Sequence, residues 1–349
     1  ETTENNDLSK SSQSITVDES IAEDILATQA DTAVVVGTVS DYLTAKGDAK
    51  LYNINLPAGV YLQAQLTTPA NADLDYDLYL LDAEGNILTG SDYYTYINGT
   101  AGTLPEALGY ITSGDTATYY LYVLASEGGS VSESFTLDYS VSTACDSYEI
   151  DESVRQALAF TYGAGGAYIE SRNLSSPIDN DWYVITVPSS RIYDKLKISA
   201  TTASTNTCSV EVYQNVASEG YQMKRVGSGN TISVSSGKYY IRVSNAKTME
   251  NFDDLDIQNY KLSITPILKA TGIVITDLKG SEGLNKVVNY PGYGAHFRTQ
   301  GSGTLTVYGV LTATDSSTGV TYAVGGEQIN GLYYSPAWEA NNTSANAIR

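Results

Sequence analysis

Acidic side chains are the residues of this sequence whose types and spacing could do chemistry. Asp73, Asp75 and Asp77 alternate with apolar or aromatic residues, so a strand would place the three carboxylates on one face. Asp179-Asn180-Asp181 forms a second acidic group. Ca²⁺ takes about six to eight oxygen ligands from carboxylates, carbonyls and water. The sequence therefore predicts calcium at both groups, against the simpler alternatives of a solvated strand face and a polar turn.

A third acidic group, Asp253-Asp254-Leu255-Asp256, has the same two interpretations. Asp92 and Glu106 could add ligands to the Asp73 group from neighbouring loops. Calcium is the one cofactor that the sequence predicts.

Signatures of catalysis do not accompany these carboxylates. The one histidine, His296, has no second histidine and no recognisable nucleophile motif beside it. The Gly-x-Ser-x-Gly, His-Glu-x-x-His and phosphate-binding glycine motifs do not occur. Paired carboxylates for glycoside hydrolysis are recognised only by their separation in space. We expect a protein without catalytic activity.

Composition narrows the partners and the compartment. The chain has 19 Lys+Arg against 40 Asp+Glu, a net charge of −21, which argues against nucleic acid and anionic membrane surfaces, since both need cationic patches. No apolar run approaches the roughly 18 residues that a membrane span needs. The sequence begins with Glu1 rather than Met, so we expect an exported, extracellular or cell-surface protein whose signal peptide has been cleaved.

Two cysteines, Cys145 and Cys208, are present. A pair fits one structural disulfide in an oxidising compartment, and two reduced buried thiols are the alternative. A bond between them would close a loop of about 60 residues and stabilise the fold by ~4 kcal/mol in the loop-entropy treatment.

An internal repeat organises the elements that must position these groups. The phrase Val17-Asp18-Glu19-Ser20 returns as Ile150-Asp151-Glu152-Ser153. Four more pairs of segments follow in the same order: 36–40 with 168–171, 48–54 with 179–185, 119–123 with 239–243, and 135–139 with 260–264. Such self-similarity predicts two copies of one domain, at 15–142 and 146–267.

Within each copy the segments are short, β-branched or aromatic, and bounded by Gly, Asn, Asp or Ser. This pattern predicts an all-β chain built from antiparallel sandwiches. The opening phrase is the exception, because the apolar residues at 21, 22, 25 and 26 have helical spacing and Asp18 or Ser20 could cap a helix. We therefore expect one helical turn at the start of each copy.

The two ends of the chain lie outside the repeat. Residues 1–14 form a polar arm with one leucine, too little apolar surface to order by itself. Residues 270–349 predict a small immunoglobulin-like β domain, with a strand over 271–278 and a hairpin whose strands, 303–313 and 320–324, flank a turn at 315–319.

The repeat resembles the bacterial pre-peptidase C-terminal (PPC) domain over about 250 residues. The features that carry the resemblance are the Asp-Glu-Ser phrase, the Gly-Thr-Val strand at 37–39, the acidic turn before an aromatic strand at 179–183, the Asp-Leu-Tyr-Leu strand and Gly-Asn turn at 77–86, and the closing strand at 237–243. The resemblance implies tandem secreted, jelly-roll-like β-sandwiches that serve adhesion, secretion or spacing, sometimes bind calcium, and do not catalyse. The second copy has Cys208-Ser209-Val210-Glu211-Val212-Tyr213 in place of the Asp-Leu-Tyr-Leu strand, so the Asp73 row is not part of the repeat.

These features favour a non-catalytic structural protein of a prokaryotic cell surface, a subunit of a self-assembling filament or surface layer. The polar arm would dock on a neighbouring subunit by strand addition, and contacts that do not close would make a fibre. One alternative is a calcium-dependent carbohydrate-binding or adhesion module, with the tyrosine-rich stretches 93–96 and 332–338 facing glycans. Another is the accessory tail of a secreted hydrolase.

Overall fold

The structure is a computed structural model. It describes residues 13–14, 34–71, 73–92, 94–97, 100–101, 104–143, 145–202, 208–216, 222–228, 230–246, 249, 258–269, 272–280, 285–289, 297–300, 303–316, 318–325 and 328–334. These residues form strands β1 to β26 and no α-helix, which confirms the predicted all-β class. Within the described ranges, no helix is long and apolar enough to cross a membrane.

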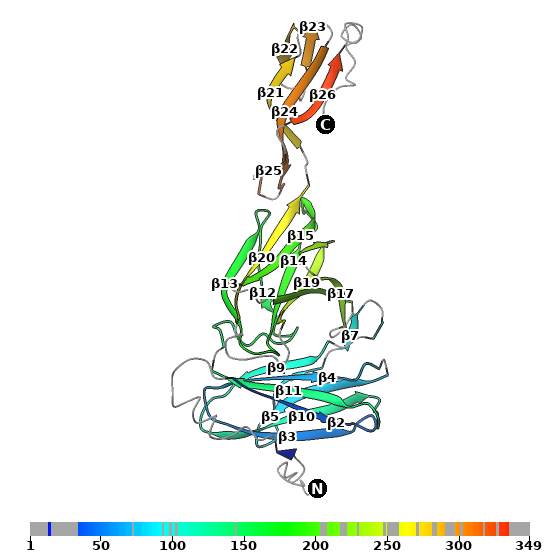
Figure 1. Cartoon of the computed structure of the whole chain (residues 1–349), viewed down its shortest axis with the longest axis vertical. Coiled ribbons are helices and arrows are strands. Elements are labelled where there is room, and N and C mark those ends of the chain that lie inside the picture. The colour runs from blue at the N-terminus through cyan, green and yellow to red at the C-terminus, as the bar shows by residue number, and fades with distance from the viewer. Residues whose placement is uncertain are drawn as a thin grey trace.

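The first sandwich consists of two sheets packed face to face (Figure 1). One sheet has the order β1 (Gln13–Ser14), β3 (Ala49–Leu56), β10 (Ala117–Glu127), β5 (Asp75–Leu81), β6 (Ile87–Ser91). The other has the order β2 (Val34–Asp41), β11 (Phe135–Ser142), β4 (Tyr61–Thr67), β9 (Glu106–Ile111). The strand predicted around the Asp73 group is β5, and it lies between two partners.

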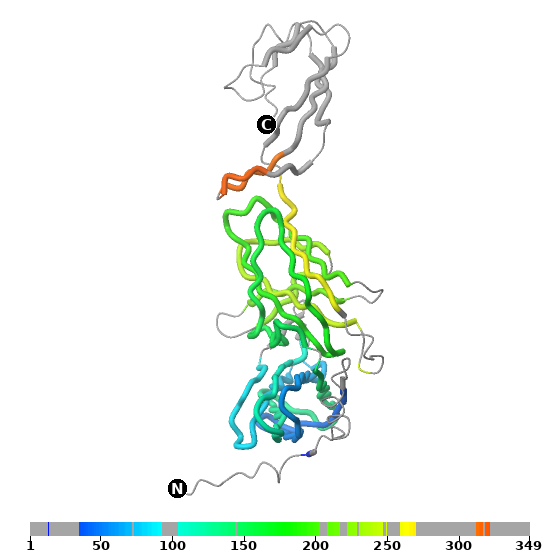
Figure 2. Tube along the Cα trace, turned by 90° about the vertical axis from the view of Figure 1, so that its left-hand side faces the viewer, coloured from blue at the N-terminus to red at the C-terminus, as the bar shows by residue number. Residues whose placement is uncertain are grey.

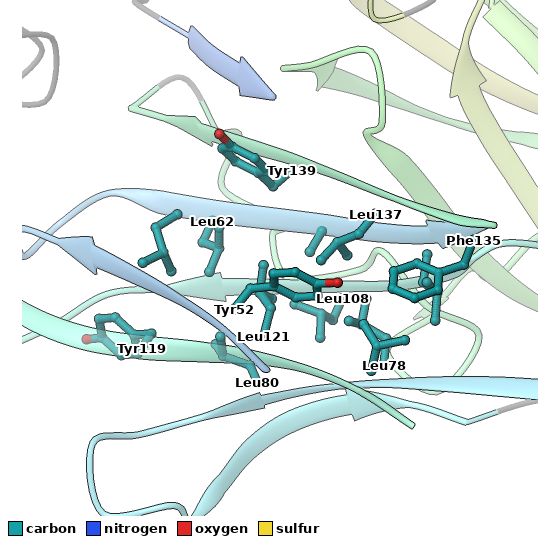
Figure 3. Packing of buried hydrophobic residues seen from close by; sticks show 14 of the residues in the cluster. Tyr52, Leu62, Leu78, Leu80, Leu108, Tyr119, Leu121, Phe135, Leu137 and Tyr139 are labelled. Atoms are coloured by element: carbon teal, nitrogen blue, oxygen red, sulfur yellow. The ribbon is translucent and has the colours of Figure 1, made fainter. Parts of the chain in front are cut away.

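The core of this sandwich follows from the alternation of side chains along each strand (Figure 3). On β5, Tyr76, Leu78 and Leu80 are fully buried, as the sequence predicts for one face of a pleated strand. The Tyr76 ring meets Phe135 edge to face, with centroids 6.2 Å apart. The hairpin after β5 is closed by Asp82, whose Oδ1 accepts the Asn86 backbone N–H at 2.7 Å.

The second sandwich repeats this topology strand for strand. Its sheets have the orders β12 (Leu158–Ala159), β14 (Asn180–Val187), β19 (Gly237–Asn245), β16 (Cys208–Asn215), β17 (Gln222–Ser228), and β13 (Ala167–Leu174), β20 (Gln258–Leu268), β15 (Tyr193–Thr202), β18 (Thr231–Ser233). Segments that match in sequence therefore lie on equivalent strands, such as 119–123 on β10 and 239–243 on β19.

The predicted helical turn is wrong for the second copy, and its counterpart in the first copy lies outside the described residues. Residues 151–156 run as bends and turns, and Leu158–Ala159 is strand β12. The reason is that this segment lies along the open edge of β14, where the Trp182 N–H donates to the Asp151 carbonyl at 3.0 Å. The apolar residues of this irregular segment pack on the neighbouring strands without forming a helix, and Val154 is buried against Trp182.

The two sandwiches are joined by a strand and by packing. The strand β7 (Tyr94–Ile97) leaves the first sandwich and pairs in parallel with β17 of the second, followed by β8 (Thr100–Ala101). A separate apolar cluster forms at the junction from Leu104, Val154, Trp182, Tyr213, Met223 and Tyr240. Both views show the sandwiches stacked along the long axis (Figures 1 and 2), and Figure 1 shows β4 and β9 of the first on the side toward the second.

The C-terminal strands form separate sheets. In one, β24 (Gly303–Thr314) pairs with β21 (Gly272–Gly280), β25 (Thr321–Gly325) and β26 (Gln328–Tyr334), and in the other β22 (Asn285–Asn289) pairs with β23 (Phe297–Gln300). The predicted hairpin is the β24–β25 pair, closed by the Asp315 N–H donating to the Val320 carbonyl at 2.9 Å. Gly319 has φ +72° in this turn, which suits glycine.

Candidate metal centre: a buried carboxylate cluster

Five carboxylates converge at the junction of the two sandwiches. They come from the segment before β12 and from the start of β14, and we call them the carboxylate cluster: Glu149, Asp151, Glu152, Asp179 and Asp181. All but the partly buried Glu149 are at most 1% exposed. Their oxygens form two groups, each within 4.8 Å, namely Glu149 with Glu152 and Asp179, and Glu149 with Asp151 and Asp181. Glu149 thus belongs to both groups.

The guanidinium of Arg172 on β13 balances part of this negative charge. Its Nη2 lies 3.1 Å from Asp181 Oδ2 and also contacts Asp151, while its Nη1 bonds Asp146 at 2.7 Å. Arg172 Nε donates to the Tyr183 hydroxyl at 2.7 Å. Each nitrogen of the guanidinium therefore has a partner, and its ion pairs among the described residues are with Asp146, Asp151 and Asp181.

Each carboxylate of the cluster keeps one oxygen that no hydrogen-bond donor among the described residues reaches. These oxygens are Glu149 Oε1, Asp151 Oδ1, Glu152 Oε2, Asp179 Oδ1 and Asp181 Oδ1. Buried polar atoms are nearly always paired, and an unpaired buried charge costs several kcal/mol, on the order of 3–5. Five such oxygens at one place indicate either bound protons or a bound cation.

The position of Asp179 shows how the sequence directs a carboxylate into the cluster. Its Oδ2 accepts the backbone N–H of Ser175 and, at 2.8 Å, the Ser175 hydroxyl. The same pair of hydrogen bonds occurs in the first sandwich. There Asp48 Oδ2 accepts the Thr44 N–H at 2.9 Å and the Thr44 hydroxyl at 2.7 Å. Because one oxygen is fixed by the turn, the other oxygen of Asp179 is held at the cluster.

Burial raises the carboxyl pKa values throughout the cluster. It raises the pKa of Glu149 to about 7, and the neighbouring carboxylate of Asp146 adds to this while Arg172 opposes it. Burial alone raises the pKa of Glu152 to about 8. The pKa values of Asp151, Asp179 and Asp181 are raised well above the ordinary value, again by burial first and by neighbouring carboxylates second. Without a cation, the cluster holds protons near neutral pH.

The first sandwich covers one side of the cluster with the outer face of β4 and β9. The Tyr61 hydroxyl contacts Glu152 Oε1 and lies 2.8 Å from Glu149 Oε2, but it has a single proton to donate. Gln63 Nε2 donates to Glu152 Oε1 at 3.0 Å. Gly109, opposite Gln63 on β9, leaves room for Glu152, since a Cβ there would collide with Glu152 Oε2. Both sandwiches therefore build this site.

The structure brings together the second predicted group and not the first. Asp179 and Asp181 are in the cluster, whereas Asn180 turns away and its Oδ1 accepts from Arg242 at 2.7 Å. Asp73 is exposed, Asp75 is half-buried and Asp77 is 7% exposed, and the three form no close carboxylate group within the described ranges. Calcium at the Asp73 row stays a prediction.

The side chains near that row have other partners. Burial, followed by the Asp75 charge, raises the pKa of Asp77 to about 6. Asp92 forms an ion pair with Arg155, and Glu106 accepts from the Ser91 hydroxyl.

The predicted disulfide is not formed. Cys145 and Cys208 are both free and partly buried, which corresponds to the alternative of two reduced thiols. Cys145 lies near the cluster, where burial and the Glu149 charge raise its thiol pKa. Cys208 opens β16 and packs on the core of the second sandwich, and burial raises its pKa to about 11. The two thiols therefore have different surroundings, whereas a bond needs Cα atoms within about 7 Å.

Three other predicted features lie outside the described residues or side chains. They are His296, the acidic group 253–256, and the tyrosine-rich stretches, of which only the backbone of β7 and β26 is described.

Sequence reasoning missed Glu149, Asp151 and Glu152 as site residues. The signal was present, because the Asp-Glu-Ser phrase opens the repeat and contains two of them. The helical spacing of the phrase predicts a helix start instead, with Asp18 or Ser20 as its cap in the first copy.

No protein-family model and no curated protein matches the sequence. Among solved structures, PliG of Aeromonas hydrophila, a periplasmic inhibitor of g-type lysozyme, is similar at 11% identity over 38% of this chain and 96% of its own, with a TM-score of 0.20. The CUB1-EGF-CUB2 domain of human MASP-1/3 covers 66% of this chain and 99% of its own, at 11% identity and a TM-score of 0.19. The CBM22-1-CBM22-2 tandem domain of Paenibacillus barcinonensis Xyn10C covers 69% and 94%, at 11% identity and a TM-score of 0.20. At these TM-scores the likenesses carry no argument about function.

Proposed function

We propose that this chain is a non-catalytic, calcium-binding structural module for use outside the cell, and that its cation sits in the carboxylate cluster. The observation that carries the proposal is the set of five buried carboxylate oxygens without a donor among the described residues. Paired charges and coordinated metals are the usual ways in which such groups are stabilised. A divalent cation would neutralise charge that Arg172 does not reach.

The donor set favours calcium over other metals. All five side chains of the cluster offer oxygen, which selects hard cations, whereas zinc prefers nitrogen and sulfur ligands. Mg²⁺ holds an octahedral shell and keeps several waters, while Ca²⁺ tolerates irregular, ligand-rich sites. Five carboxylates, with Glu149 shared between two groups, match Ca²⁺ better.

The extracellular role rests on charge and on ion supply. The net charge of −21 suits a soluble surface protein, and extracellular modules typically bind Ca²⁺ with Kd of about 10⁻⁴–10⁻³ M, where external calcium keeps them loaded. Because Tyr61 and Gln63 of the first sandwich hold Glu152 of the second, a bound cation would stiffen the junction. Stiff tandem sandwiches suit a filament or surface-layer subunit. Carbohydrate binding and a hydrolase tail stay predictions.

Isothermal titration with CaCl₂ and with MgCl₂ tests the proposal on the full chain after chelation. We expect calcium binding, weak or no magnesium binding, and a rise in melting temperature with calcium, because a ligand of the folded state stabilises it by mass action. The double substitution Asp179→Asn and Asp181→Asn removes two charges and should abolish both effects.

The matched control is Asp73→Asn and Asp75→Asn, which removes two carboxylates from the Asp73 row and should leave binding unchanged. Calcium binding that survives the Asp179/Asp181 substitutions and is lost in the control would overturn the assignment and move the site to β5. Electron microscopy of the native secreted material with and without chelator then separates filament, layer and monomer.

A further inference from the structure

The outer edge of β3 is held by a segment that comes from outside the repeat. β1 pairs in parallel with β3, with Gln13 opposite Tyr52 and Ser14 opposite Asn53. The equivalent place in the second sandwich is filled by β12, with Leu158 opposite Tyr183 and Ala159 opposite Val184. The two pairings have the same direction and the same register on equivalent strands.

The repeat assigns a different segment to the β3 edge. Val17 to Ser20 align with Ile150 to Ser153, and the same offset places Ile25-Leu26 opposite Leu158-Ala159. β1 lies upstream of this phrase, in the polar arm, whereas β12 lies downstream of it. The chain therefore carries two segments for one strand edge, one of them in the polar arm.

The described side-chain contacts of β1 are polar, whereas those of its counterpart are apolar. Gln13 is exposed, and its side chain makes one long hydrogen bond, 3.4 Å to Asp41 Oδ2. In the second sandwich, Leu158 packs against the apolar core, and the edge is extended by the Phe160 N–H donating to the Val184 carbonyl at 2.9 Å. Main-chain pairing joins β1 to β3, and such pairing can be made equally well by another chain.

The β3 edge lies away from the junction with the second sandwich (Figures 1 and 2). The dark blue strand β1 lies at the end of the molecule opposite to the second sandwich, next to the N-terminus, in both views (Figures 1 and 2). The junction that holds the carboxylate cluster is on the other sheet of the first sandwich.

We propose that the outer edge of β3 is an assembly site that takes the arm strand Gln13–Ser14 of a second copy of this chain in place of its own. The contacts made in trans repeat those made in cis, so exchange loses little beyond the entropy of association. Arm and edge are different surfaces, so the contact is head-to-tail and extends into a chain of subunits. This inference deepens the proposed structural role and rests on it.

Two populations of full-length chain test the exchange, both with Cys145→Ser and Cys208→Ser. One carries Ser14→Cys, and the other, labelled with ¹⁵N, carries Asn53→Cys. Neighbouring strands lie about 4.8 Å apart, within the range that a disulfide spans. After mixing and mild oxidation, mass spectrometry should show a disulfide-linked heterodimer of one labelled and one unlabelled chain. The control mixes Ser14→Cys with Ser132→Cys, an exposed loop position, and should show none.

A chain with both Ser14→Cys and Asn53→Cys that closes only within itself, together with mixtures that give no heterodimer at any concentration, would overturn the proposal. A heterodimer in the control mixture at the same yield would overturn it too. Deleting residues 1–14 should abolish concentration-dependent association in sedimentation velocity, and unchanged association would count against the arm. Calcium titration of the chain without residues 1–14 separates the two proposals, since this deletion leaves the cluster and Cys145 unchanged and calcium binding should persist even where exchange fails.

Discussion

Lys50 of the first sandwich occupies the place that Asp181 occupies in the second, and the two carry opposite charges. Each is the second residue of its strand, β3 or β14, and each pairs with an equivalent valine, on β10 or β19. Lys50 Nζ lies 3.1 Å from Asp41 Oδ2, and Asp181 Oδ2 lies 3.1 Å from Arg172 Nη2. Asp41 and Arg172 are equivalent in turn, on β2 and β13. The ion pair keeps its place in the fold, but its acidic and basic residues exchange strands.

This reversal removes one carboxylate of the cluster from the equivalent place in the first sandwich. In the first, the ammonium of Lys50 stands where the second has a carboxylate, so the site carries its own cation. In the second, the same position adds a negative charge to four others, and Arg172 supplies one positive charge against these five carboxylates.

The substitution Lys50→Met tests this comparison. It leaves Asp41 with Tyr52 as its remaining side-chain donor from β3, at 3.1 Å, and should lower the free energy of unfolding by about 1 kcal/mol, the upper range for a partly exposed pair. Calcium should bind the variant as it binds the parent chain and should not restore the loss. Urea unfolding with and without CaCl₂ measures both, and a calcium-specific rescue would contradict the comparison.

The two thiols give a direct check on the corrected disulfide. Under denaturing, non-reducing conditions, iodoacetamide should add two carbamidomethyl groups, one at Cys145 and one at Cys208, because both are free in the structure. In the folded protein, reaction near pH 8 should be slow at Cys208, whose pKa burial raises to about 11, since the thiolate is the reactive form. Mass spectrometry counts the additions, and an unmodified chain would reinstate the bond.

Tyr61 and Gln63 test whether the first sandwich contributes to the cation site of the second. Tyr61→Phe combined with Gln63→Leu removes the donors that orient Glu149 and Glu152. Outer-shell losses of this kind weaken metal affinity roughly 10- to 100-fold, so the calcium Kd should rise in that range. Tyr122 lies on the sheet away from the cluster, where its ring packs on the neighbouring Tyr79, so Tyr122→Phe is the matched control and should leave Kd unchanged. An unaltered Kd in the double variant would assign the site to the second sandwich alone.

The repeat, the sandwiches and the β5 alternation were predictable because each depends on local patterns. Because side chains alternate between the two faces of a strand, the local sequence places Leu78 and Leu80 together on its apolar face. The repeat can also be found by comparing the two halves of the sequence with each other. The acidic turn at Asp179 could also be found from a local pattern, because Asp179 accepts its hydrogen bonds from Ser175, four residues earlier.

The rest of the site could not be predicted because it depends on contacts between distant elements. Asp151 and Glu152 have helix-start spacing in the sequence, and only the open edge of β14 and the face of β4 draw them into a buried cluster. Arg172 lies in a strand whose register places it opposite Tyr260, which no spacing reveals. The disulfide failed similarly, because two cysteines in a sequence carry no information on distance.

The pH dependence of stability follows from the raised pKa values of the cluster. The folded chain keeps protons on Glu149, to about pH 7, and on Glu152, to about pH 8, whereas the unfolded chain loses them near its ordinary pKa of about 4. Between these limits the folded state binds more protons, so the stability of the metal-free chain falls as pH rises. Calcium takes the place of the protons, so saturating CaCl₂ should remove this fall and bind more tightly at higher pH. Melting temperatures from about pH 5 to pH 8, in chelator and in CaCl₂, measure the effect. The variant with Asp179→Asn and Asp181→Asn should show a shallower fall, and a metal-free melting temperature that rises across this range would contradict the buried cluster itself.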